Sequence, residues 1–394
     1  MSSTSTPTTG SGYLRAEDCH LDDLLTIIEA GTDLADYPHA DSVAQGVLLY
    51  DAVALRDAVT DDDSRRGVRA EVARALADGP GIVVVQGAFE HDVVDRVSKA
   101  FERVIAREKA EGGPSGDHFA APGANDRVWN ALEKLAVADP DAFVEYYAND
   151  ILALAASAWL GPGYQVTSQV NVVNPGGAGQ TVHRDYHLGF QAPKVSADFP
   201  AHVHALSPAL TLQGAVAHCD MPVESGPTLY LPHSQKYVHG YLAYWLPEFQ
   251  EYFVDHHVQL PLAKGDAVFF NPALFHAAGT NHTAQVRRMA NLLQVSSPFG
   301  RAMETVDRRR VVESVYPALL ARKRAGMPPA RVGDVVAASA EGYAFPTNLD
   351  RDQPVNGMSP PTQADLVRRA LGEAVTPEEL SERLAAHEHR TRSH

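Results

Sequence analysis

The stretch from residue 164 to residue 297 constrains the fold most, because it contains several short β-rich runs and no helical pattern between them. Gly, Pro, Asn and Asp separate these runs, as they do at the ends of strands. The runs are YQVTSQVNVV, PALTLQGAVAHC, GPTLYLP, HHVQLPL, DAVFFNP and RRMANLLQVSS. Parallel strands need a long crossover between them, usually a helix. The pattern therefore predicts a β-sandwich or barrel rather than a parallel sheet.

Helical patterns dominate the rest of the chain. Residues 13–110 carry apolar side chains at helical spacing, interrupted by GIVVVQGAF at 81–89, which predicts a short buried strand. Further helices are predicted over 126–138, 141–159, 301–324, 362–372 and 376–388. We therefore expect a mainly β core with α elaborations, flanked by N- and C-terminal helices.

Charge and cysteine content limit the cellular compartments and the classes of binding partner that fit this chain. The chain has 33 Lys and Arg against 49 Asp and Glu, a formal net charge of -16, which repels nucleic acid and anionic lipid. No apolar stretch approaches the roughly 20 residues that a membrane-spanning helix needs. Residues 1–12 read as a flexible tail without the features of a signal peptide, and two cysteines far apart fit a reducing compartment. We expect a soluble, cytoplasmic protein with no nucleic-acid or membrane partner.

The segment His183-Arg184-Asp185, together with His276, is the strongest chemical signal. Alternate residues of a strand share a face, so His183 and Asp185 present an imidazole and a carboxylate to the same point. His276 follows another strand-like run, DAVFFNPALF. Two histidines and a carboxylate on one side of a metal leave positions open for a co-substrate and for O2, as in non-haem Fe(II) oxygenases. A His-x-Asp alone is more often surface or core filler, but the order of strands around this one predicts three Fe(II) ligands.

An arginine follows His276 by eleven residues, in HAAGTNHTAQVRR. A guanidinium can hold a carboxylate through two parallel hydrogen bonds, which suits the far carboxylate of 2-oxoglutarate once the keto-acid end binds iron. Arg287 and Arg288 point to opposite faces of a strand, so only one of them can have this role. The spacing favours Arg287, and Arg288 is then a solvent-exposed charge.

Three further residues are candidates for binding the co-substrate or substrate. Asn171 lies on the polar face of an alternating run, which is either the inside of the barrel or a solvated outer face. His187 lies two residues beyond Asp185 and supports a ligand or touches the co-substrate, unless it is a structural histidine. Thr228, in GPTLYLP, either faces the pocket or is ordinary strand filler.

The stretch from 164 to 297 resembles the phytanoyl-CoA dioxygenase family of 2-oxoglutarate oxygenases. The matching pieces are HRDYHLGF, SGPTLYLPHSQK and HAAGTNHTAQVRR, and GIVVVQGAF resembles the family's N-terminal opening. The resemblance implies a double-stranded β-helix, which is a jelly-roll or cupin-like fold, with the metal at its mouth. It also implies Fe(II), 2-oxoglutarate and O2 as cofactor and co-substrates. Asp185 occupies the position where halogenating relatives place a small residue, which favours hydroxylation.

The resemblance sets the expected organisation of the chain. We expect a flexible tail at 1–12, an oxygenase domain at 13–300 with a jelly-roll core at about 164–297, and a C-terminal helical extension at 301–394, with a homodimer possible through the extra helices. The expected reaction is hydroxylation of a small-molecule metabolite or natural-product intermediate, with release of succinate and CO2. Two alternatives stay open: a catalytically silent jelly-roll protein that binds a metabolite, and a cupin-type or zinc-dependent metal enzyme that does not use 2-oxoglutarate.

Overall fold

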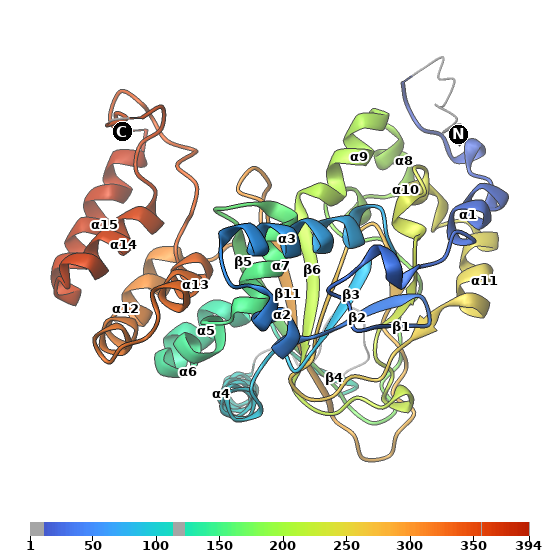
Figure 1. Ribbon diagram of the computed structural model, residues 1–394, viewed down its shortest axis with the longest axis horizontal. Coiled ribbons are helices and arrows are strands. Elements are labelled where there is room, and N and C mark those ends of the chain that lie inside the picture. The colour runs from blue at the N-terminus through green and yellow to red at the C-terminus, as the bar shows by residue number, and fades with distance from the viewer. Residues whose placement is uncertain (1–11, 113–122, 356, 394) are drawn as a thin grey trace.

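The computed structural model describes residues 12–112, 123–355 and 357–393. Over these residues, two β-sheets are surrounded by helices, and the helices are more numerous than the sequence patterns predict (Figure 1). The fold is therefore a mixed sheet with many helices rather than a mainly β protein with a few additions. None of the described helices combines the length and the apolar character that a bilayer crossing requires.

The larger sheet has eight strands in the order β1-β2-β3-β9-β6-β11-β5-β4. Among its described strands β2 and β3 pair in parallel, and the other neighbouring pairs are antiparallel. Its strands are β1 Ser42–Ala44, β2 Val47–Asp51, β3 Ile82–Gln86, β4 Asn125–Val128, β5 Gln165–Val173, β6 Thr211–Ala217, β9 Ala267–Phe270 and β11 Arg288–Ser296. The buried run at 81–89 is confirmed as a strand, β3.

The smaller sheet has three strands in the order β10-β7-β8: β7 Leu229–Leu231, β8 Val258–Gln259 and β10 Phe275–Ala277. A backbone bridge between His183 and His276 adds the segment around His183 beside β10. From β5 onward the chain therefore passes between the two sheets several times. This alternation brings segments from distant parts of the sequence into the space between the sheets.

The two faces of the larger sheet pack differently, and β11 shows how the sequence sets this. Met289, Leu293 and Val295 alternate along β11 and belong to a hydrophobic cluster shared with the helices. Residues of the opposite parity, including Arg288, then face the smaller sheet, because successive side chains of a strand point to opposite sides. A separate cluster fills part of the space between the sheets and contains Phe270 of β9, Tyr230 of β7 and Leu274.

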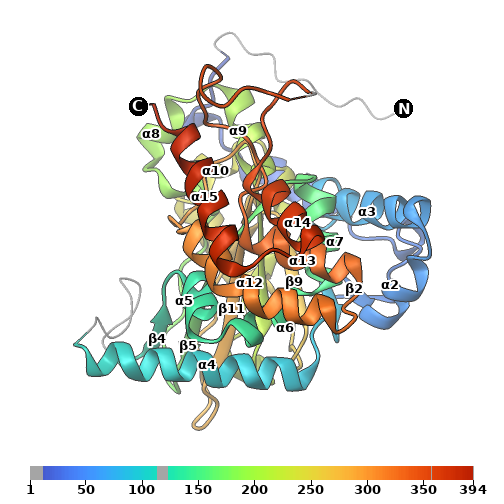
Figure 2. The ribbon, with the colours of Figure 1, turned by 90° about the vertical axis from the view of Figure 1, so that its left-hand side faces the viewer.

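Helices cover one face of the larger sheet and both ends of the molecule (Figures 1 and 2). On the sheet face, α5 contacts β5, α7 contacts β6 and α3 contacts β3. The N-terminal half contains α1 Leu21–Ile28, α2 Ala52–Ala58, α3 Asp62–Ala77, α4 His91–Ala110, α5 Ala131–Ala138, α6 Pro140–Tyr147 and α7 Asp150–Leu160. Later helices are α8 Pro193–Ala197, α9 Ala201–Ala209, α10 Gly240–Ala243, α11 Pro247–His256, α12 Arg308–Arg324, α13 Pro329–Ser339, α14 Gln363–Glu373 and α15 Pro377–Thr391.

The C-terminal helices are integrated with the rest of the chain. α12 packs on α5 and α6, and α13, α14 and α15 follow around it (Figure 2). One hydrophobic cluster runs without a break from the sheet to these helices, through residues such as Val170, Phe143, Leu319 and Leu380. Burial of this apolar surface fixes the C-terminal segment against the sheet-covering helices.

Three expectations about local structure were wrong. Helices α8, α9, α10 and α11 lie within 164–297, where none was predicted, as insertions between the strands. The predicted helix at 126–138 also begins too early, because Asn125–Val128 forms β4 and pairs with β5. A sequence as short as NDRV carries too little periodicity to show that a sheet edge is available to it. The predicted helix at 141–159 is divided in two, since the Asn149 side chain accepts a hydrogen bond from Leu152 and starts α7 there.

Candidate metal centre

The segment around His183 lies beside β10, and this pairing brings the predicted ligands together. The amide of His183 donates to the carbonyl of His276 at 2.9 Å, and the amide of His276 donates back at 3.2 Å. The amide of Asp185 donates to the carbonyl of Pro272 at 3.0 Å. These bonds hold both strands extended, so His183 and Asp185 present their side chains on the same side as His276.

The three side chains form a compact cluster. Among the described residues, His183, Asp185 and His276 are a group that could hold a metal ion, and their ligand atoms all lie within 4.8 Å of one another. One carboxylate oxygen of Asp185 is 3.7 Å from Nε2 of His183, and the other is 3.3 Å from Nε2 of His276. The three side chains are from 5 to 26% exposed, so the cluster is shielded but reachable.

The backbone orients both imidazoles in the same way. Nδ1 of His183 is 2.9 Å from the carbonyl of Thr181, and Nδ1 of His276 is 2.8 Å from the carbonyl of Leu274. A carbonyl only accepts hydrogen bonds, so each Nδ1 carries the proton and each Nε2 keeps a lone pair. Both lone pairs face the Asp185 carboxylate, which is the donor set that Fe(II) takes in facial-triad enzymes. The residues therefore fit a divalent metal ion.

Electrostatics hold these groups in the protonation states that metal binding requires. Burial lowers the pKa of His183 below its usual value, which favours the neutral imidazole. Burial raises the pKa of Asp185, but the neighbouring imidazoles of His183 and His276 and a hydrogen bond from Gln213 outweigh it and leave that pKa far below its usual range. Neutral imidazoles and an ionised carboxylate are the forms that bind metal.

A glutamine on the larger sheet, Gln213, contacts Asp185, and sequence reasoning missed both this residue and its cross-strand neighbour Gln294. The amide of Gln213, on β6, donates to the Asp185 carboxylate. Gln213 is paired across the strands with Gln294 of β11, so the two side chains share a face. The Oε1 atoms of both are buried without a hydrogen-bond partner in the described structure. The alternation of Gln213 with buried apolar residues in TLQGAVA was the available signal.

Arg184, between the two ligands in sequence, points away from them and anchors their strand. It is 2% exposed, and its Nη2 donates to the carbonyls of Ser234 and Tyr237 at 2.6 and 3.0 Å. Its guanidinium also lies over the rings of Tyr241 and Phe275, at 5.1 and 5.0 Å. Burial lowers the pKa of Arg184 to about 10, so the group stays charged at neutral pH.

The structure does not bring Arg287 into the space between the sheets. The Arg287 side chain is 53% exposed and lies 3.7 Å from the carboxylate of Asp126, at the edge of the larger sheet. It has the parity of Met289, which packs toward the helices. Arg288 is the buried member of the pair: its Nη1 donates to the carbonyls of Ser225 and Gly279 at 3.0 and 3.2 Å. The expectation that Arg288 is the solvent-exposed charge is wrong.

The other three candidates lie at different places around the centre. Asn171 pairs across the strands with Ala290, which shares the parity of Arg288, so Asn171 faces the smaller sheet. Thr228 immediately precedes β7 and hydrogen-bonds through its side chain to Tyr230, the cross-strand partner of His276. His187 begins the short 3-10 helix His187–Phe190, with Nε2 3.4 Å from the Thr211 hydroxyl on β6.

Comparison with known proteins gives the chain its family. Residues 77–289 match the model of the phytanoyl-CoA dioxygenase family. Among the solved structures to which the chain is similar is AviO1 from Streptomyces viridochromogenes Tue57, with 20% identity and a TM-score of 0.42 over 59% of this chain and 96% of AviO1. Two others come from nogalamycin biosynthesis: the non-haem α-ketoglutarate-dependent carbocyclase SnoK, with a TM-score of 0.39, and the epimerase SnoN, with a TM-score of 0.37. Each of these two is 19% identical to this chain, and each match covers 60% of this chain and 85% of the other. A search of curated proteins gave no match.

The family match accounts for the donor set found between the sheets. Enzymes of the phytanoyl-CoA dioxygenase family use Fe(II) with 2-oxoglutarate and O2, and the cluster of two histidines and an aspartate fits that requirement. The matched segment includes the whole cluster and covers more than half of the 394 residues. This chain belongs to the phytanoyl-CoA dioxygenase family.

Proposed function

We propose that this chain is an Fe(II)- and 2-oxoglutarate-dependent oxygenase that hydroxylates a small organic molecule, with His183, Asp185 and His276 as the iron ligands. The observation that carries the proposal is the direction of the two Nε2 lone pairs, both of which face the Asp185 carboxylate. Bound Fe(II) supplies the activation of O2, coupled to oxidation of 2-oxoglutarate to succinate and CO2. The Asp185 carboxylate supports hydroxylation over halogenation, because it occupies a coordination position that a halide would need.

Arg288, in place of Arg287, is our candidate for holding the far carboxylate of 2-oxoglutarate. A buried guanidinium is held in a fixed orientation, and charge-assisted bidentate pairing to a carboxylate is strong where water is excluded. Two carbonyls already fix one nitrogen of Arg288. Asn171 and Thr228 lie on faces directed between the sheets and are candidates for further hydrogen bonds to the co-substrate, while His187 is a candidate at the mouth.

Gln213 has a positioning role in this proposal. It donates to one oxygen of Asp185, Oδ2, and leaves Oδ1 on the side of His183. Hydrogen bonds of this kind fix the orientation of a ligating carboxylate and change metal affinity when they are removed. The unpartnered Oε1 atoms of Gln213 and Gln294 can accept hydrogen bonds from a substrate.

We further propose that the two sheets are the halves of a double-stranded β-helix. After β5 in the larger sheet come the His183 segment in the smaller one, β6 in the larger, β7 and β8 in the smaller, and then β9, β10 and β11 in alternation. Alternation of consecutive strands between two sheets supports a jelly roll. In this scheme 13–300 is the oxygenase domain, and 301–394 is a helical extension that packs on it.

The test measures succinate formation from 2-oxoglutarate by anaerobically purified, Fe(II)-loaded protein after exposure to O2. We expect slow turnover without added substrate and none in Asp185→Ala. Before O2 is added, the wild type should also show the visible charge-transfer band of an Fe(II)–keto-acid complex. Absence of both the band and succinate would contradict the proposal. Binding of 2-oxoglutarate that survives in Asp185→Ala, without turnover in either protein, would support the silent metabolite-binding alternative.

A further inference from the structure

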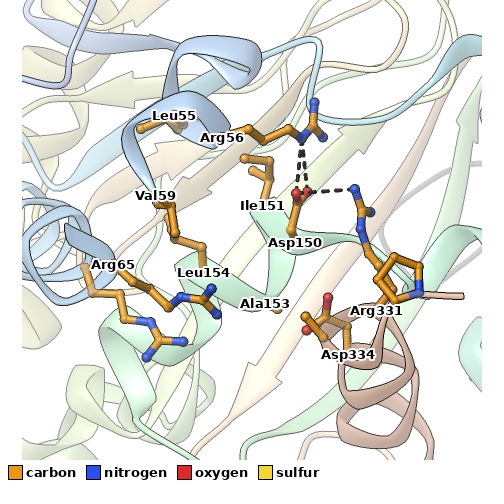
Figure 3. Close-up of a pocket in the computed structure, with 13 residues that line it drawn as sticks. Leu55, Arg56, Val59, Arg65, Asp150, Ile151, Ala153, Leu154, Arg331 and Asp334 are labelled. Carbon is orange, nitrogen blue, oxygen red and sulfur yellow. Dashed lines mark hydrogen bonds and ion pairs between the residues drawn. The ribbon is translucent and has the colours of Figure 1, made fainter. Parts of the chain in front are cut away.

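A second cavity, of about 240 Å³, lies on the helical side of the molecule among α2, α3, α7 and the start of α13 (Figure 3). None of its lining residues belongs to the metal centre. The cavity is slightly smaller than most ligand pockets, which measure roughly 300–1,000 Å³, so it suits a small ligand. It joins segments that are far apart in the sequence, since α2 and α3 come from the N-terminal part and α13 from the C-terminal part.

Arginines dominate the polar part of the lining. Arg56, Arg65, Arg69 and Arg331 contribute four positive charges, and Asp150 and Asp334 contribute at most two negative ones. Figure 3 shows Arg56 and Arg331 meeting at Asp150, and Asp334 on the side of the cavity away from Arg56. The lining therefore carries an excess of positive charge, although the chain as a whole is strongly acidic.

Two of the arginines, Arg56 and Arg331, form ion pairs and hydrogen bonds with other residues of the protein. Nε of Arg56 donates to both oxygens of Asp150 at 3.2 Å, and its Nη2 donates to the Ala88 carbonyl at 3.1 Å. Nη2 of Arg331 lies 3.3 Å from Asp150, and its Nη1 donates to the Ala148 carbonyl. These two arginines and Asp150 link α2 to α7 and α13, and their charges are largely used within the protein.

The side chains of Arg65 and Arg69 lack such contacts in the described structure. The two residues lie one turn apart on α3, so their side chains emerge on the same side of the helix. In the described structure neither side chain forms an ion pair or a hydrogen bond, and the Nε atom of each is buried without a partner. Burial lowers the pKa of Arg69 and the charge of Arg65 lowers it further, while attraction to Tyr164, Asp334 and Asp62 opposes both. A half-buried pair of like charges is unfavourable unless an anion compensates it.

Asp334 supplies only part of that compensation, through attraction to both arginines without a direct ion pair. It has no ion pair within 4.0 Å and no hydrogen bond among the described contacts. Burial raises the pKa of Asp334 to about 7, while attraction to Arg331, Arg65 and Arg69 opposes the rise. Much of its charge is therefore lost near neutral pH, and the two arginines remain in excess.

The remaining lining is apolar and gives the cavity a second chemical character. Leu55 of α2, Val59 directly after it and Leu154 of α7 contribute aliphatic side chains (Figure 3). We propose that this cavity binds a small organic anion, with its phosphate or carboxylate group between Arg65 and Arg69 and its apolar body against Leu55, Val59 and Leu154. Guanidinium groups match both kinds of anion, because they donate two parallel hydrogen bonds to a pair of oxygens. The site is independent of the metal centre and of the reaction proposed above.

Binding is tested with the full-length chain by titration calorimetry and by thermal unfolding. The probes are n-butyl phosphate, hexanoate and inorganic phosphate, with NaCl added to equal ionic strength. We expect butyl phosphate or hexanoate to bind and to raise the melting temperature, and inorganic phosphate to bind more weakly because it lacks the apolar body. Whichever organic probe binds more tightly identifies the head group. If none of the three binds beyond the effect of NaCl, the proposal is overturned.

Matched variants locate the binding. Arg65→Gln together with Arg69→Gln should weaken binding at least tenfold, whereas Arg66→Gln should leave it unchanged. Arg66 lies on the same helix with its side chain 81% exposed and outside the cavity. The Asp185→Ala variant should bind the probes as the wild type does, which separates this site from the metal centre. Equal loss of binding in Arg66→Gln and in the double variant would overturn the assignment.

The unliganded protein offers a second measurement, which guards against variants that simply fail to fold. Because Arg65 and Arg69 repel each other, Arg65→Gln alone should unfold at the same temperature as the wild type or higher in the absence of any probe. The same variant should lose the thermal shift that the organic anion gives. A lower melting temperature without ligand would show that Arg65 stabilises the fold and would contradict the proposal.

Discussion

The metal centre and the arginine cavity, defined by Arg56, Arg65, Arg69, Arg331 and their neighbours, treat buried charge in opposite ways. At the metal centre, the Asp185 carboxylate accepts a hydrogen bond from Gln213 and both imidazoles are held by backbone carbonyls, so neighbours position all three ligands before any ion binds. In the cavity, Arg65 and Arg69 have no partner in the described structure. Each region nevertheless lacks one charge of known sign: a cation in the first and an anion in the second.

The two regions should therefore differ in how far their geometry depends on a bound ligand. A carboxylate with hydrogen-bonding neighbours keeps its geometry when the ion leaves, because the neighbours compensate part of its charge. Two like charges without a counterion separate or draw in solvent instead. We therefore expect the metal centre to be the more rigid of the two regions without ligand, and the cavity to change more when its ligand binds.

The largest expected effect comes from Asp185→Ala. Removal of the carboxylate leaves two imidazoles, which bind Fe(II) too weakly to retain it, so succinate formation should fall by at least about a thousandfold. Iron content measured after desalting should fall with it. Binding of butyl phosphate or hexanoate at the arginine cavity should not change. Loss of both functions together would show that the two regions are coupled and would break the comparison.

Arg288, the first residue of β11, and Arg287, directly before it, provide the next largest contrast. Arg288→Ala should raise KM for 2-oxoglutarate about a hundredfold, which corresponds to loss of one charge-assisted bidentate contact of about 3 kcal/mol. Arg287→Ala should change KM less than about threefold, because this side chain is exposed and its ion pair with Asp126 lies at the edge of the sheet. Steady-state kinetics with varied 2-oxoglutarate checks both, and the reverse order of effects would restore Arg287 as the binding residue.

Gln213→Ala is expected to have a smaller effect on the metal centre. The variant keeps all three ligands but loses the amide that holds Oδ2 of Asp185. Fe(II) affinity should fall about tenfold, within the range seen when a hydrogen-bonding partner of a ligand is removed. Competition with a chelator measures this affinity. An unchanged affinity would mean that the two histidines alone hold Asp185 in place.

The smallest expected effect is a pH-dependent change in stability at the cavity. The pKa of Asp334 is about 7 in the folded chain, above an unfolded value near 3.9, so the folded state holds more protons between these values. Stability therefore falls as pH rises from about 4 to about 7. Asp334→Asn mimics the protonated form and should be more stable than the wild type by about 1–2 kcal/mol at pH 8, after allowance for partial exposure.

Denaturant unfolding at pH 8 and at pH 4 checks this prediction. The advantage of Asp334→Asn should be present at pH 8 and absent at pH 4, where Asp334 is protonated in the folded wild type. An advantage of equal size at both pH values would assign the effect to packing rather than to charge. An organic anion at Arg65 and Arg69 should leave the direction of the pH dependence unchanged.

Much of the metal centre could be predicted from the sequence, because the positions of its ligands follow from residue spacing within short strands. Spacing alone places His183 and Asp185 on one face, and His276 ends a clear strand pattern. The choice between Arg287 and Arg288 needed the parity of β11, and that signal was present: Met289, Leu293 and Val295 mark the helix-facing side, which Arg287 shares. A shift of one residue along a strand reverses every side chain, so spacing counted from His276 could not decide.

The arginine cavity could not be predicted in the same way. Its polar residues come from α2, α3, α7 and α13, which meet only after the C-terminal helices have packed on the N-terminal ones. In the sequence SRRGVRAEVARAL, nothing distinguishes Arg65 and Arg69 from the other arginines of the same helix. The helices α8 to α11 were missed for a related reason, since insertions between strands carry weak periodicity of their own.

Arg184 has a consequence for how the chain acquires its metal. The guanidinium fills a space that even a single added carbon at Gly240 would invade, coming within 1.9 Å of its central carbon. The segment from His183 to Asp185 is therefore held in place by Arg184 on the side away from the metal centre, with or without a bound ion. Most of the entropy of ordering His183 and Asp185 is lost during folding, and little remains to be lost when the ion arrives. Iron can then enter and leave a finished chain as an exchangeable part, without any need for the protein to refold around it.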